Sequence, residues 1–182
     1  MPQPEHAAVP TTEGHDQDGL VRDPERVADV AAIRDLAISY AHAVDDRDWD
    51  RFGALWAPDA TIDYTASGGI AASAAEVTAW MPGALAIFTW CLHSISTHEI
   101  RFTGPDTATG RVHVFNRNGL VWEGQDEVFD VGGRYLDEYV RLGDRWRFAR
   151  RVESLTYLHG GGFAEVVRGL AAAAGDAGAA AD

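Results

Sequence analysis

The sequence predicts an α+β fold in which three N-terminal helices pack on a curved, mixed or antiparallel sheet and leave a cone-shaped interior. Two observations carry this prediction. Apolar residues recur mainly with a helical period near 3.6 up to Trp90, and with the period of two typical of strands after it. Helices followed by long antiparallel strands form an α+β domain, because the helices can cover one face of the sheet.

The chain of 182 residues is long enough for one domain with tails. Residues 1–22 carry Pro, Thr, Gly and acids without periodicity, which predicts a disordered N-terminal tail. The domain is expected to span residues 23–162. The Ala/Gly-rich segment 163–182 is expected to be a mobile C-terminal tail, with a short helix over residues 163–170 as the alternative.

The first helix has signals at its start and along its length. Asp23 is a suitable N-cap and Pro24 fits the first helical position. Apolar residues then follow at spacings of three and four, which draws one stripe down a helix that ends near Asp46. Residues 61–65 alternate apolar and polar side chains after the second helix, and this pattern predicts a strand.

The second and third helices are bounded by capping residues and prolines. Asp48 is expected to cap the second helix and Pro58 to stop it. The segment Ser73–Glu76 reads as a capping box that opens the third helix. Pro82 is expected to break or restart that helix, whose apolar face continues to Phe88.

The second half predicts four strands joined by hairpin-type breaks such as Gly143-Asp144. Gly132-Gly133 lies inside the third of these strands and indicates a bulge or a sharp bend. The predicted strands cover residues 91–102, 109–118, 126–142 and 145–158.

Charge and composition exclude several classes of partner. The net charge of −13 disfavours binding to nucleic acid or to an anionic membrane surface. The sequence has no apolar run long enough to span a membrane, and its first residues lack the pattern of a signal peptide. A lone cysteine, Cys91, cannot form an internal disulfide. We therefore expect a cytoplasmic protein.

Strand alternation sorts the polar residues of the second half by face. Cys91, His93 and Ile95 share one face of their strand, and Asn116 shares a face with two valines on the next. Alternation separates Arg151 from the apolar face of the last strand unless a bulge intervenes. Taken singly these are weak signals, because a buried polar residue usually finds a partner without any chemistry.

The order and spacing of several motifs are more specific. They are Tyr40-x4-Asp45 with Trp49 close behind, the strand from Thr61 to Tyr64, His93 about fifty residues after Asp45, and the closing run 146–151. In this order the chain resembles the nuclear transport factor 2-like superfamily, in the SnoaL-like branch that holds scytalone dehydratase, γ-hexachlorocyclohexane dehydrochlorinase and bile-acid 7α-dehydratase. The resemblance covers roughly residues 23–159.

The resemblance implies a set of site residues. The lyases of this branch pair a helix Asp with a strand His, which by position are Asp45 and His93 here, with Tyr40, Arg151 and Asn116 as further catalytic residues. His98 is the competing histidine. Imidazole can act as a base near neutral pH, and a carboxylate on its other ring nitrogen fixes the tautomer. The expected substrate-binding residues are Tyr64, Trp56, Trp80, Phe88, Cys91, Phe115 and Tyr135.

The resemblance also implies a function. We expect a cofactor-independent lyase of the dehydratase type, acting on a small hydrophobic cyclic substrate such as a steroid, terpenoid or polyketide. An isomerase or polyketide cyclase, and a non-catalytic subunit like the β subunit of ring-hydroxylating dioxygenases, remain as alternatives. A metal site from His93, His98 and His113 is disfavoured, because strand alternation puts the first two on opposite faces. The exposed convex face of such a sheet predicts a homodimer or homotrimer.

Overall fold

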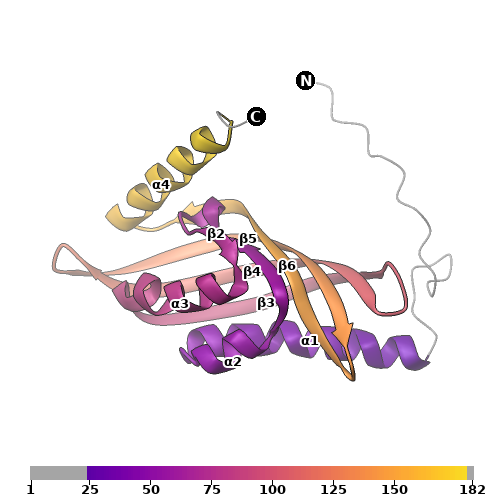
Figure 1. Cartoon of the computed structure of the whole chain (residues 1–182). Helices are drawn as coiled ribbons and strands as arrows, with labels where there is room; N and C mark the ends of the chain where they lie inside the picture. The colour runs from indigo at the N-terminus through magenta and orange to yellow at the C-terminus, as the bar shows by residue number, and fades with distance from the viewer. Residues whose placement is uncertain (1–23, 180–182) are drawn as a thin grey trace.

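The computed structural model describes residues 24–179 and shows one curved sheet with helices packed along it (Figure 1). The predicted N-terminal tail and the N-cap Asp23 lie outside the described residues. The sheet has six strands in the order β2-β1-β6-β5-β4-β3. β1 pairs with β6 in parallel, and every other pair is antiparallel. The predicted mixed α+β fold is thereby confirmed. The strands are β1 (Trp56–Asp63), β2 (Ala71–Ser73), β3 (Phe88–Phe102), β4 (Thr107–Trp122), β5 (Gln125–Leu142) and β6 (Arg145–His159).

Three helices precede the long strands, as predicted. They are α1 (Pro24–Asp45), α2 (Trp49–Ala54) and α3 (Ala74–Ala84), with short 3₁₀ turns η1 (Thr65–Ser67) and η2 (Leu85–Ile87). The side chain of Asp48 caps α2 and the capping box at Ser73 and Glu76 is formed, so both of these predictions are confirmed. The apolar stripe of α1 is buried against the sheet through residues such as Ile33, Tyr40 and Val44.

Two proline predictions and one helix end were wrong. α2 stops at Ala54, because Trp56 already opens β1, and Pro58 lies in the interruption of the β1–β6 ladder between Trp56 and Thr61. A proline cannot donate to the ladder, so it is tolerated at such a gap. Pro82 lies in the last turn of α3, two residues before the helix ends at Ala84, and the helix continues through it. Phe88 begins β3 instead of extending the helical face.

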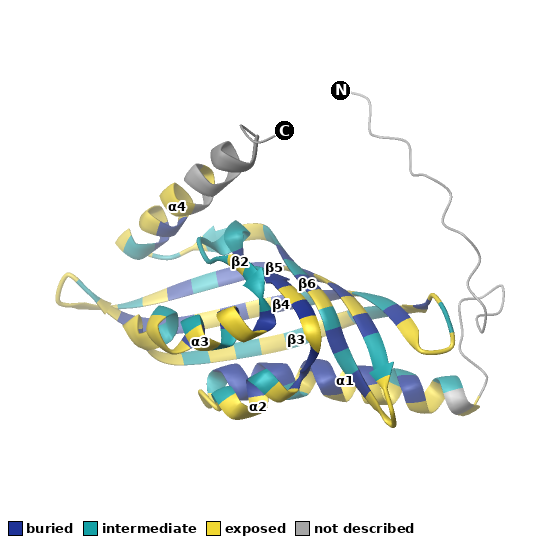
Figure 2. Cartoon of the chain, in the orientation of Figure 1, coloured by how far each residue is buried: buried dark blue, intermediate teal, exposed yellow. Residues whose placement is uncertain are grey.

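Bulges in the long strands change which side chains face inward. Two neighbouring residues of β5, Glu138 and Tyr139, pair with Arg150 and Phe148 of β6. Ala149, between these two β6 residues, is therefore an extra residue that bulges from the strand. The bulge puts Arg151 on the same buried face as Phe148, the arrangement that strand alternation alone excluded. A second register shift falls between Gly132 and Gly133, which pair with Tyr157 and Leu155. The irregularity is at the predicted position along the ladder, but the extra residue is Thr156 of β6 and not one of the glycines. Figure 2 shows the resulting alternation of buried and exposed residues along the strands.

β3 carries a further bulge that corrects a prediction. Ile95 pairs with Val114 and His98 pairs with Val112, so β3 holds one more residue than β4 over this stretch. The extra residue brings His98 to the inner side, where its Nε2 lies 3.1 Å from the Tyr139 hydroxyl. The prediction that His93 and His98 have opposite faces was therefore wrong.

A fourth helix, α4 (Gly162–Ala179), occupies the segment for which a mobile tail was expected. The structure agrees with the alternative of a helix over 163–170 and extends it. Ala164 and Val167 are buried, and together with Phe163 they pack on a second apolar cluster around Phe88 and Phe129. No helix within residues 24–179 is long and apolar enough to cross a membrane.

Candidate active site

The centre of the site is a hydrogen-bonded pair of Asp45 and His93. Asp45 is the last residue of α1, and His93 lies on β3. The Asp45 Oδ1 atom lies 2.6 Å from His93 Nδ1, and Oδ2 accepts the His93 backbone N–H at 2.9 Å. Two contacts to one carboxylate fix the position of the ring as well as its tautomer, which leaves Nε2 unprotonated when the imidazole is neutral.

The placement of Asp45 is unfavourable for the helix itself. A carboxylate in the last turn meets the negative end of the helix dipole, which costs roughly 0.3–1 kcal/mol at an ordinary position. The two N–H groups of His93 compensate for this by binding the carboxylate directly. An aspartate at position 45 is therefore explained by its contact with His93 and not by the stability of α1.

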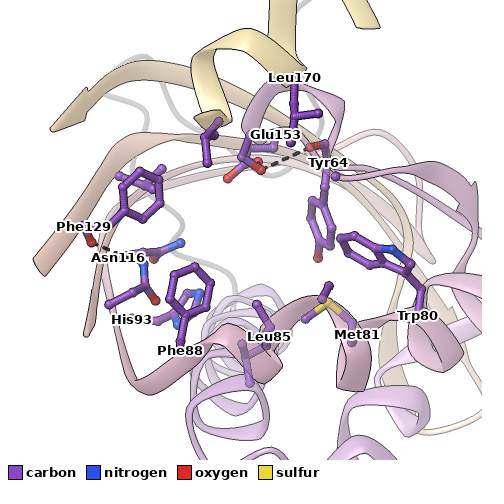
Figure 3. A pocket seen from close by; sticks show the side chains of 18 of the residues that line it. Tyr64, Trp80, Met81, Leu85, Phe88, His93, Asn116, Phe129, Glu153 and Leu170 are labelled. Carbon is purple, nitrogen blue, oxygen red and sulfur yellow. Dashed lines mark hydrogen bonds between the residues drawn. The ribbon is translucent and has the colours of Figure 1, made fainter. Parts of the chain in front are cut away.

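The imidazole of His93 borders an apolar cavity of about 260 Å³ (Figure 3). The walls come from α1, α3, the inner face of the long strands and α4. Among residues 24–179, no protein group bonds Nε2 of His93, so this nitrogen is available to a ligand. The apolar lining includes Val44, Trp80, Met81, Leu85, Phe88, Phe129, Val131, Phe163, Val167 and Leu170.

Three buried phenols form another part of the wall. The hydroxyls of Tyr40 and Tyr64 lie 2.8 Å apart, and the ring of Tyr135 meets that of Tyr40 edge to face. Burial raises the pKa of Tyr40, and it raises the pKa of Tyr64 and Tyr135 well above the usual value of a phenol. All three stay protonated near neutral pH. The bond between Tyr40 and Tyr64 uses the proton of one of them, which leaves the other hydroxyl of this pair free to donate to a cavity ligand.

Arg151 lies beneath these phenols and not at the cavity surface. Its guanidinium is fully buried and makes two bonds, of 2.7 and 2.8 Å, to the Asp137 carboxylate. Burial alone would lower the pKa of Arg151, but the Asp137 carboxylate outweighs this and holds the pKa well above its usual value. The charged carbon lies 4.1 and 4.0 Å from the rings of Tyr40 and Tyr135. Arg151 is thus placed to position the phenols.

Asn116 is a further polar group near His93. The two residues face each other across the β3–β4 ladder. The side-chain oxygen of Asn116 is buried and has no hydrogen-bond partner within residues 24–179, although it borders the cavity. An unpaired buried amide is costly unless a ligand or water binds it. Asn118, two residues on, also lines the cavity and bonds the Phe129 carbonyl at 3.5 Å.

Not every predicted site residue borders the cavity. Tyr64, Trp80, Phe88 and Tyr135 do, as expected from the sequence. Trp56 lies in the core, where it packs on Phe148. Cys91 is half-buried and outside the lining, and burial raises the pKa of its thiol to about 11. Phe115 is exposed on the outer face of the sheet.

His98 is also outside the lining. Burial lowers the pKa of its imidazole to about 4, and its partner is the Tyr139 hydroxyl, which in turn donates to Asp137. Of the two histidines that competed for the same role, His93 alone borders the cavity. In the part of the chain that the structure describes, no group of three His, Cys, Asp or Glu residues is placed to hold a metal ion.

Sequence reasoning missed Glu153 and the contribution of α4. Glu153 lies on β6, is buried at 7% exposure and borders the cavity. It shares the inner face with Arg151, two residues before it, and this spacing was the available signal. The signal in α4 was the spacing of Phe163, Val167 and Leu170, which draws one helical stripe.

The fold and the site together define a cone-shaped α+β domain with an Asp–His pair in the wall of an apolar cavity. The chain belongs to the SnoaL-like domain family, whose sequence profile matches residues 25–152. An uncharacterised protein of Mycobacterium tuberculosis is 35% identical over 128 residues, which is 70% of this chain and 86% of the relative. The γ-hexachlorocyclohexane dehydrochlorinase of Sphingobium indicum is 30% identical over 141 residues, covering 74% and 85%. A solved structure from Kribbella flavida is similar in fold, with a TM-score of 0.69 at 24% identity, over 79% of this chain and 99% of that one.

Proposed function

We propose that the protein is a cofactor-independent lyase of the dehydratase type that acts on a small hydrophobic cyclic substrate. One observation carries the proposal: Asp45 binds one nitrogen of His93 while the other nitrogen faces an apolar cavity. This is the geometry that a general base needs. A non-catalytic subunit would have no need for such a pair in a cavity. The dehydrochlorinase relative supports an elimination reaction.

In the proposed reaction, Nε2 of His93 removes a proton from the carbon next to a carbonyl group. The Asp45 carboxylate stabilises the imidazolium that forms. The Tyr64 hydroxyl donates to Tyr40, whose own proton is donated to the carbonyl oxygen as negative charge develops on it. One such donor is typically worth about 3 kcal/mol of barrier. The apolar lining excludes water and binds the rings of the substrate.

The test is a panel of cyclic β-hydroxy carbonyl compounds, followed by the absorbance of the new conjugated double bond. His93→Ala should abolish turnover, and Asp45→Asn should be severely impaired because the imidazolium loses its partner. Tyr40→Phe should lose roughly ten- to a thousand-fold, because only one donor is removed. His113→Ala is the control, since His113 lies on the outer side of neighbouring β4. Wild-type turnover in His93→Ala would end the lyase proposal.

A further inference from the structure

The cavity holds a second ionisable group that the Asp45–His93 pair does not involve. Glu153 points into the cavity from β6 (Figure 3), and its side chain accepts one hydrogen bond, from the Ser67 hydroxyl of η1. Within residues 24–179 its other oxygen has no hydrogen-bond partner. A buried carboxyl with an oxygen left open to a cavity is placed to interact with a ligand.

The surroundings of Glu153 favour its protonated form. Burial raises the pKa of this carboxyl to about 7, although the Ser67 hydroxyl and the Arg151 charge each lower it, and Asp63 raises it further. A carboxyl of this kind is about half protonated at neutral pH and can give up a proton there. The other titratable groups that face it are the protonated phenols of Tyr40 and Tyr135.

Glu153 and His93 approach the cavity from different walls. β6 and β3 are separated by β5 and β4, so their backbones lie about 14 Å apart along the sheet. Both side chains point to the inner side of a curved sheet and border the same cavity. A ligand that fills the cavity therefore lies between the two groups.

We propose, building on the lyase function above, that Glu153 is the general acid that protonates a departing hydroxyl, so that the substrate loses water and not a halide. His93 takes the proton from the carbon next to the carbonyl, and the C–H electrons form the new double bond. The C–O electrons leave with the oxygen, which receives the proton of Glu153 and departs as water. Proton exchange with solvent then returns His93 and Glu153 to their starting forms.

The leaving group decides whether such an acid is required. Hydroxide is a poor leaving group, and positioned proton transfer to it typically contributes a hundred- to ten-thousand-fold in rate. Chloride leaves as a stable anion and needs no proton. Glu153 therefore matters for one class of substrate and much less for the other.

The experiment compares a cyclic β-hydroxy ketone with its β-chloro analogue, each rate corrected for the uncatalysed reaction. Glu153→Gln keeps the shape and the bond from Ser67 but removes the proton. We expect it to lower turnover of the hydroxy compound at least a hundred-fold and that of the chloro compound less than ten-fold. Glu138→Gln, an exposed change on neighbouring β5, is the control and should match wild type on both.

The pH profile gives a second readout. Wild-type turnover of the hydroxy compound should fall as pH rises above about 7, because Glu153 loses its proton, while turnover of the chloro compound should not. Ser67→Ala removes a bond that lowers the Glu153 pKa, so the fall should move to higher pH for the hydroxy compound alone.

The outcomes separate this proposal from the lyase function. If His93→Ala abolishes both reactions while Glu153→Gln affects both equally or neither, Glu153 is not the acid and the lyase proposal stands. If His93→Ala leaves both reactions unchanged, the lyase proposal itself fails. The melting temperatures of Glu153→Gln and wild type show whether a loss of turnover comes from unfolding. If it does, the pH profile of Ser67→Ala is the test: a fall in turnover that moves to higher pH for the hydroxy compound alone supports Glu153 as the acid, and an unchanged profile contradicts it.

Discussion

At the scale of single residues, a buried ion pair lies beneath the phenols that line the cavity. Asp137 and Arg151 are 2% and 0% exposed, and the two bonds between them are parallel and short. The charges of Asp137 and Arg151 cancel, so the pair adds no net charge to the core. The guanidinium of Arg151 contacts the faces of the Tyr40 and Tyr135 rings. The Nη1 atom of Arg151 has no hydrogen-bond partner among the described residues, and a half-satisfied network of this kind is sensitive to any loss.

The first stability prediction concerns this pair. Asp137→Asn leaves the Arg151 charge buried and unpaired, which should lower the free energy of unfolding by roughly 3–5 kcal/mol. The matched control is Asp130→Asn on the outer face, where Asp130 makes the same two-bond contact with Arg117 but Arg117 is 60% exposed. That change should cost less than about 1 kcal/mol. Urea unfolding measures both, and equal losses would show that burial does not set the cost.

At the scale of elements, α4 is the part that closes the cavity. Its side chains Phe163, Val167 and Leu170 border the cavity, while Val166 between them points away and is 43% exposed. α4 also packs on η1, which carries the Ser67 partner of Glu153. The helix therefore shapes the same end of the cavity as Glu153.

A matched pair of neighbouring valines tests this role. Val167→Ser removes apolar contact with the substrate and should raise KM about ten-fold, since a lost methyl or methylene contact is worth roughly 1–3 kcal/mol. Val166→Ser makes the same chemical change on the exposed side and should leave KM within about two-fold. Steady-state kinetics on a turned-over substrate measures both. An equal KM for the two variants would show that α4 does not contact the substrate.

The elements also show which features a sequence can predict. The helices and the four long strands followed from the apolar period, because this depends on neighbours in sequence. The Asp45–His93 pairing was implied by the resemblance to the SnoaL-like lyases, since the two residues are 48 positions apart and no local pattern joins them. The bulges at Ala149 and in β3 followed from neither, because they depend on the pairing of β6 with β5 and of β3 with β4. Each bulge reverses the alternation of inward and outward side chains beyond it. The inward positions of Arg151 and His98 could therefore not be predicted by counting every second residue along the strand.

At the scale of the whole molecule, the outer face of the sheet carries several large exposed apolar side chains among charged pairs such as Arg117–Asp130. Tyr157 lies across Gly132, where a Cβ atom would come within 2.0 Å of its ring, so the glycine lets the aromatic side chain lie flat on the sheet. A monomer rarely exposes a large contiguous apolar surface, and such a surface usually marks a protein contact. The large exposed residues on this face are Trp90, Leu92, Phe115, Val121, Val128, Leu136 and Tyr157.

We expect this face to pair with a second copy of the chain, as a homodimer or homotrimer. Light scattering at micromolar concentration should give two or three times the chain mass of 19.7 kDa. Phe115→Glu places a charge in the middle of the face and should give a monomer, because an uncompensated charge cannot be buried in an apolar contact. Leu142→Glu is the control, since Leu142 is equally exposed but lies at the β5–β6 hairpin. It should keep the wild-type mass. A wild-type monomer, or an oligomer that survives Phe115→Glu, would show that the outer sheet face is not the interface.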